Sequence, residues 1–110
     1  MQNTLTATLR RRRKTLLRHL PPLDQVLRGS LIERYKRCGK PGCKCAQGRG
    51  HGPKHYLSVS RTGARPEMDY VPQAYSEQAT QYLDNYRRIR TILDELGAIN
   101  RELLRRRETF

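Results

Sequence analysis

Residues 38–55 read CGKPGCKCAQGRGHGPKH, a stretch that holds all three cysteines of the chain, two of its three histidines and five of its eight glycines. Cys38, Cys43 and Cys45 are spaced C-x4-C-x-C, and His51 and His55 follow within ten residues. Thiolate sulfur and imidazole nitrogen are the donors that tetrahedral zinc prefers, and glycines allow the backbone reversals that bring closely spaced donors together. The stretch therefore predicts one structural Zn²⁺ ion at the centre of a small fold.

The fourth ligand, beside Cys38, Cys43 and Cys45, is predicted to be His51, because His51 lies inside the glycine-rich loop. His55 is the alternative, although it already belongs to the strand expected through Tyr56. The spacing departs from the common C-x2-C pairs, so free reduced cysteines and redox or iron chemistry stay open as alternatives.

A catalytic role for this site is not expected. A catalytic zinc usually keeps an open coordination position beside an acidic residue that moves protons. The sequence has no Asp or Glu between Glu33 and Glu67, and it has no nucleophile elbow, phosphate-binding loop or paired-carboxylate signature. We therefore predict that the protein is not an enzyme.

The composition indicates a small, cytoplasmic protein. The chain has 110 residues, of which 35% are hydrophobic, with one Phe and no Trp, so one small domain is the upper bound. No apolar stretch is long enough to span a bilayer, and no secretory signal precedes the domain. Cysteines kept reduced in the cytosol favour a metal over disulfides.

The pattern of apolar residues predicts an α+β fold. A helix is expected over residues 3–20, with Asn3 or Thr4 as its N-cap and Pro21 and Pro22 ending it. Three strands of an antiparallel sheet are expected over residues 26–37, 56–61 and 68–71, with a turn at 62–66. A long helix, interrupted only by Gly97, is expected over residues 75–107. The single domain then comprises a basic N-terminal helix (1–22), a sheet with the zinc loop (23–72) and a C-terminal helix (73–110).

The long helix carries apolar residues in steps of three and four, which is typical of a coiled coil. An Asn at one of the core positions commonly fixes the register and the number of partners. The pattern favours a homodimer through this seam, and the alternative is that the seam packs on the N-terminal helix and sheet of its own chain. The seam consists of Ala79, Tyr82, Tyr86, Ile89, Leu93, Leu96, Asn100 and Leu103.

Positive charge is concentrated in the first half of the chain. Of the net charge of +13, residues 1–54 contribute 14 basic and 2 acidic side chains, whereas residues 55–110 contribute 9 and 8. Such asymmetry is typical of a surface that docks a polyanion, although solubility alone is the simpler reading of any charge run. The candidate contacts to nucleic acid are Arg10, Arg11, Arg12, Arg13 and Lys14 in the first helix, and Lys36, Arg37, Lys40, Lys44, Arg49 and Lys54 around the cysteine loop, which Tyr35 and Tyr56 flank.

The stretch RGSLIERYKRCGKPGCKCAQGRGHGPKHYLSVS, residues 28–60, with the helix that follows it, resembles a family of small bacterial proteins known only as a domain of unknown function. The similarity is specific in the loop, at Cys38, Gly39, Lys40, Cys43, Cys45, Gly48, His51, Gly52 and Pro53. It departs at Lys54 and His55, where the family usually has tyrosines. The resemblance therefore implies His51 as the ligand and leaves function open, some members being described near mobile elements.

Together these features predict a zinc-stabilised protein that binds DNA or RNA mainly through phosphates and with little sequence preference. The alternative is an interaction adaptor or dimerisation module acting through the C-terminal helix, accessory to a mobile-element enzyme.

Overall fold

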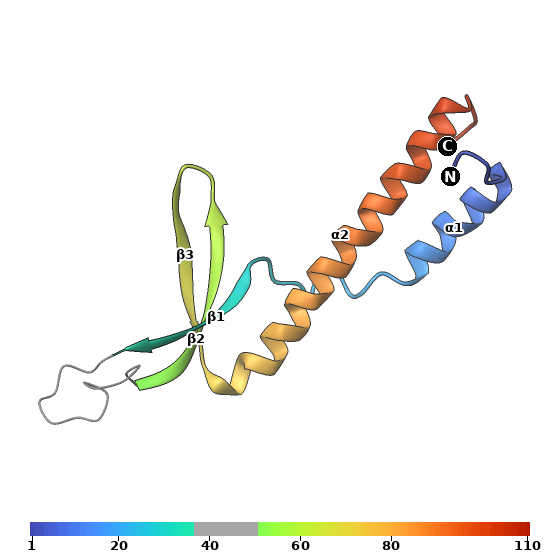
Figure 1. Cartoon of the computed structure of the whole chain (residues 1–110). Helices are drawn as coiled ribbons and strands as arrows, with labels where there is room; N and C mark the ends of the chain where they lie inside the picture. The colour runs from blue at the N-terminus through green and yellow to red at the C-terminus, as the bar shows by residue number, and fades with distance from the viewer. Residues whose placement is uncertain (37–50) are drawn as a thin grey trace, which may run out of the picture. The chain divides into compact units, whose positions relative to one another are not determined.

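A computed structural model of the chain describes residues 1–36 and 51–110. Two compact units, each with its own hydrophobic core, are formed by Met1–Val26 with Asp84–Phe110 and by Leu27–Leu83. The α+β class is confirmed, with a helix, three antiparallel strands and a long helix. The elements are α1 (Thr6–Arg18), β1 (Ser30–Lys36), β2 (His51–Arg61), β3 (Ala64–Val71), the 3₁₀ helix η2 (Gln73–Tyr75) and α2 (Ser76–Arg105) (Figure 1).

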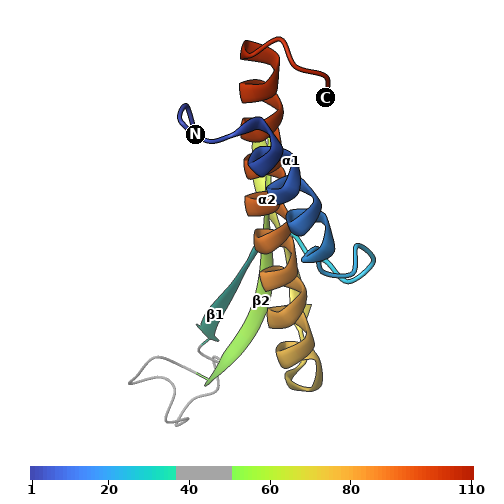
Figure 2. The same cartoon turned by 90° about the vertical axis from the view of Figure 1, so that its right-hand side faces the viewer.

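In the first unit, α1 lies antiparallel to the C-terminal half of α2, and we call this pair the helical hairpin (Figures 1 and 2). Leucines on one side of α1 recur about every two turns and meet a matching apolar side of α2. The buried members of this core are Leu9, Leu16, Ile92, Ile99 and Leu103.

The start of α1 differs from the prediction of an Asn3 or Thr4 cap. Leu5 is the N-cap, and no side chain caps the helix. Residues 1–4 instead form a turn in which the Thr4 N–H donates to the carbonyl of Met1. Arg106, the residue that follows α2, donates to the carbonyls of Met1 and Gln2 and to the hydroxyl of Thr6. These contacts hold the segment out of the helix, which therefore begins later than its sequence suggests.

In the second unit, the strands follow the order β1-β2-β3, and both neighbouring pairs are antiparallel. β2 and β3 are longer than predicted, and the turn between them is Thr62-Gly63 rather than residues 62–66. Gly63 has φ 67°, a conformation that lets two residues reverse the chain. Pro66 falls inside β3, where it is tolerated because β3 is an edge strand.

One face of this sheet packs on the start of α2. Leu57 and Val71 are buried against Ala79 and Leu83 of the first turns of α2, with Leu27, Leu31 and Val59 packed around them. We call this side of the sheet the core face. Because side chains alternate along a strand, the register places the remaining strand residues on the opposite side, which we call the open face.

Helix α2 runs unbroken through Gly97, so the long helix is confirmed and the alternative that it stops at Gly97 is wrong. No helix in the described ranges is long and apolar enough to cross a membrane.

The seam predicted for self-association is partly used within the chain. Ala79 packs on the sheet, and Leu96 and Leu103 belong to the core of the helical hairpin. Leu93, by contrast, is 56% exposed, and Asn100 accepts a hydrogen bond of 2.8 Å from Arg13. Self-association through the exposed part of the seam stays a prediction.

Two glycines provide a matched test of this fold. Gly29 has φ 130°, and a Cβ there would lie 2.5 Å from the carbonyl oxygen of Ser58, whereas a Cβ at Gly97 meets nothing within 4 Å. Gly29→Ala should lower the free energy of unfolding by more than about 1 kcal/mol. Gly97→Ala, in the middle of a helix, should raise it by about 0.5 to 1 kcal/mol. Urea denaturation of both variants checks this, and an unchanged midpoint for Gly29→Ala would contradict the described approach of the backbone to β2.

Candidate nucleic-acid interface

The base of the cysteine loop is formed by the last residue of β1 and the first of β2. Lys36 and His51 are Cα partners in the antiparallel pair, next to a register shift. Cys38, Cys43 and Cys45, and the loop cations Arg37, Lys40, Lys44 and Arg49, lie outside the described residues. Within the described ranges, no three His, Cys, Asp or Glu side chains come close enough to hold a metal ion. The zinc site therefore stays a prediction.

His55, the alternative fourth ligand, has a partner on the core face. Its Nε2 lies 3.5 Å from Oε1 of Glu33, the residue that pairs with it across β1 and β2. The His55 side chain is 25% exposed. A carboxylate partner is common for a metal-ligating histidine, so this contact does not separate the two candidates. His51 stays the predicted ligand because it stands at the loop's end, whereas His55 lies four residues further along β2.

Three of the five consecutive cations of α1 bind other parts of the helical hairpin. Arg12 donates to both carboxylate oxygens of Glu95, at 2.6 and 3.1 Å. Arg13 donates to Asn100, and Arg10 donates to the carbonyl of Thr109 and lies 3.7 Å from Glu108. These side chains hold α1 against α2 and are therefore less free for an external phosphate.

Two carboxylates of the helical hairpin have a lowered pKa because arginines donate hydrogen bonds to them. The hydrogen bond from Arg12 lowers the pKa of Glu95. Glu102, whose side chain is only 7% exposed, accepts hydrogen bonds from Arg106 and Arg105, and these lower its pKa, the bond from Arg106 most. The positive charges of the arginines beside these carboxylates are therefore already balanced within the helical hairpin.

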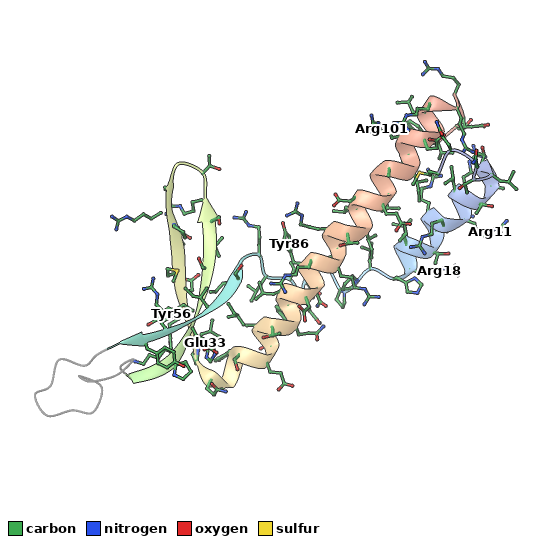
Figure 3. All side chains as sticks on the ribbon, viewed as in Figure 1. Arg11, Arg18, Glu33, Tyr56, Tyr86 and Arg101 are labelled. Carbon is green, nitrogen blue, oxygen red and sulfur yellow. The ribbon has the colours of Figure 1, made fainter. Side chains whose placement is uncertain are left out.

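The remaining cations of α1 point to one side of the helix. Arg11, Lys14 and Arg18 are spaced i, i+3 and i+7, which places them together, opposite the leucines of the core. All three are exposed, and none forms an ion pair with any carboxylate in the described part of the chain. Arg18 reaches only Thr15 of its own helix. We call these three residues the cationic stripe; Figure 3 labels Arg11 and Arg18.

The open face of the sheet carries its side chains in three rows across the strands. The middle row places Tyr56 of β2 beside Tyr70 of β3, with ring centroids 5.7 Å apart and ring planes at 63°. Arg34 and Lys54 pair in the next row toward the loop, and both are exposed. The register assigns the described open-face residues as Ser30, Ile32, Arg34, Lys54, Tyr56, Ser58, Met68 and Tyr70.

Acidic side chains are absent from these described open-face positions. Glu33, Glu67 and Asp69 all alternate to the core face, where they pair with His55, Val59 and Leu57. Figure 3 labels Tyr56 and Glu33, which represent the two faces. The described part of the open face is therefore aromatic and positive.

An apolar pocket of about 300 Å³ lies in the same unit, but it has no charged lining residue. Tyr70 and Tyr75 line it together with Pro72 and Ala79. The pocket therefore offers no charge to a phosphate, unlike the cationic stripe and the open face.

Sequence reasoning missed Tyr70 and could not separate the paired from the unpaired cations of α1. Tyr70 could have been found from the register of the β2–β3 hairpin. Placing a two-residue turn at Thr62-Gly63 would have paired Tyr70 with Tyr56. The partners Glu95, Asn100 and Glu108 lie more than 80 residues along the chain from the arginines that they contact, so no local pattern indicated them.

A family model described as a domain of unknown function (DUF6788) matches residues 6–81. The chain belongs to this family. The DUF6788 match takes in α1, the three strands and the first turns of α2, so the cationic stripe and the open face both fall within it. The comparison with curated proteins and the comparison with solved structures each gave no match.

Proposed function

We propose that the chain is a nucleic-acid-binding protein, stabilised by one structural zinc ion, that contacts mainly the phosphate backbone. The observation that carries the proposal is the cationic stripe: three exposed cations remain on one side of α1 after Arg10, Arg12 and Arg13 have found partners inside the helical hairpin. Cations without a carboxylate partner release the counterions of a phosphate backbone when they bind it. Lys54 of the other unit, and the loop cations named above, are further proposed contacts to phosphate.

The proposed zinc ligands are Cys38, Cys43, Cys45 and His51. The pairing of Lys36 with His51 supports this set, because it places the backbone of His51 opposite a residue that precedes Cys38 by only two positions. In this proposal the metal joins the two ends of the loop and takes no part in catalysis. The resemblance of the cysteine loop to a motif of small bacterial proteins is also part of this proposal.

The function is tested by neutralising the cationic stripe. The triple variant Arg11→Gln, Lys14→Gln and Arg18→Gln should bind a DNA duplex more weakly, and its log–log plot of affinity against salt should be shallower by about 0.9 for each lost contact, or about 2.7 in all. Fluorescence anisotropy titrations at several salt concentrations measure both quantities.

A control triple removes the same charge from cations that already have carboxylate partners. Arg61 lies 3.0 Å from Glu67, Arg87 3.1 Å from Asp84 and Arg105 3.3 Å from Glu102, and all three side chains are more than half exposed. Changing these to Gln should reduce the salt slope much less. An equal reduction in both triples would show that net charge alone, and not the stripe, sets the affinity.

The adaptor function is the second candidate, because α2 keeps apolar side chains in contact with solvent. Leu93 and Leu104 are 56% and 50% exposed, and both lie on the flank of α2 that also carries Tyr86 and Ile89. A second copy of the chain would cover this flank. Sedimentation of the wild-type protein used for the titrations separates the candidates: a tight dimer without oligonucleotide affinity would favour the adaptor and exclude the nucleic-acid function.

A further inference from the structure

The open face of the sheet carries aromatic rings beside cations, whereas the cationic stripe consists of cations. Tyr56 and Tyr70 are direct cross-strand neighbours, and Tyr70 is 55% exposed. A tyrosine ring offers a flat π surface on which any base can stack. Two rings with centroids 5.7 Å apart can each stack on one of two bases that follow one another along a nucleic-acid strand.

Phosphate contacts would come from the row beside the rings. Arg34 and Lys54 are paired across β1 and β2, one row from Ile32 and Tyr56. Among the described residues of this face no carboxylate opposes them, because Glu33, Glu67 and Asp69 lie on the core face. The face is thus complementary to an anionic chain that also exposes planar rings.

A single strand fits this description better than a duplex. The bases of a duplex are stacked on each other and present only their edges, so the tyrosine rings could not reach their planes. An acidic peptide would match the cations but would leave the rings without planar partners.

We infer that the open face is a stacking platform for single-stranded nucleic acid, with Tyr56 and Tyr70 against bases and Arg34 and Lys54 against the phosphates. This inference rests on the proposed function and adds the class of substrate to it. The cationic stripe binds single-stranded and double-stranded nucleic acid alike, whereas the platform binds only the single strand.

The test compares the affinities for a fluorescent single-stranded oligonucleotide and for the duplex of the same length. In the double variant Tyr56→Leu and Tyr70→Leu, apolar volume is kept and the rings are lost. Its affinity for the single strand should fall about 5- to 150-fold for each ring that stacks, and its affinity for the duplex should stay unchanged. Tyr56→Phe with Tyr70→Phe keeps the rings and should retain wild-type affinity.

Tyr75→Leu is the matched control. Tyr75 is 59% exposed and belongs to the same unit, but it lies in η2 and outside the sheet. Its substitution should leave single-strand affinity unchanged. A loss as large as that of the double variant would assign the effect to general aromatic exposure and overturn the platform.

The remaining outcomes separate the platform from the proposed function. Equal affinity of the wild type for both forms, with no effect of the Leu substitutions, overturns the platform and leaves the cationic stripe as the binding surface. No affinity for either form overturns the proposed function as well. If the Leu variants fail to fold, photocrosslinking of the wild type to a halogenated-uracil single strand decides: crosslinks at Tyr56 or Tyr70 support the platform, and their absence overturns it.

Discussion

Removing the proposed zinc ion with a chelator should unfold the three-stranded sheet and leave the helical hairpin folded. Among the described residues, the core of the sheet unit buries Leu57, Val71, Ala79 and Leu83, a small core for three strands. A structural zinc ion contributes about 10 to 16 kcal/mol of apparent binding energy in small peptides, and this energy becomes folding energy when the site exists only in the folded chain. Hydrogen exchange should show protection lost around Leu57 and Val71 and kept around Ile99 and Leu103.

Two histidine variants provide the control for the metal. His51→Asn should lower the zinc content and the stability of the sheet, as the chelator does. His55→Asn should keep the zinc, because His55 lies inside β2, four residues beyond His51 at the end of the loop. Protein purified without added metal that contains no zinc, and whose three thiols titrate freely in the native state, would remove the zinc site altogether.

Leu103→Ala should be the most damaging single substitution in the helical hairpin. Leu103 is 0% exposed, and Ile99 beside it in the core is 1% exposed, so truncation leaves a cavity that the surroundings fill only in part. We expect the free energy of unfolding to fall by about 2 to 5 kcal/mol, a large fraction of the about 5 to 15 kcal/mol of a typical domain. Thermal and urea denaturation measure the loss.

Leu93→Ala is the control on the same helix. Because Leu93 is 56% exposed, its truncation should change the free energy of unfolding by no more than about 0.5 kcal/mol. A loss as large as that of Leu103→Ala would mean that Leu93 is covered in solution. Such a result would support the second copy that the adaptor function requires.

The order and type of the elements could be predicted because each has a strong local pattern. The long helix follows from apolar residues repeated in steps of three and four, and β2 from the alternation around Leu57 and Val59. Which residues of the long helix are buried could not be predicted. A 3.5-residue repeat drifts from the 3.6-residue turn, and α2 packs first on the sheet and then on α1, so Leu83, Ile92 and Ile99 are buried in place of Tyr82 and Leu93.

The sequence predicted the candidate site as a set of cations. Contacts between segments that are distant in the sequence show which of these cations have partners and which are exposed. The run Arg10 to Lys14 looks uniform in the sequence. Glu95 and Asn100 distinguish its members, because they bind Arg12 and Arg13 and leave Arg11 and Lys14 exposed. The aromatic pair likewise depends on the register of a hairpin, in which a shift of one residue would move Tyr70 to the other face.

The separation of charge between the two faces of the sheet affects how the sheet is oriented before it touches nucleic acid. Carboxylates at Glu33 and Asp69 on one side and cations at Arg34 and Lys54 on the other give the sheet an electric dipole across its thickness. In the field of a polyanion such a dipole experiences a torque that turns its positive side toward the negative charge. An approaching strand would therefore meet the tyrosines first, with the sheet oriented during diffusion rather than after collision.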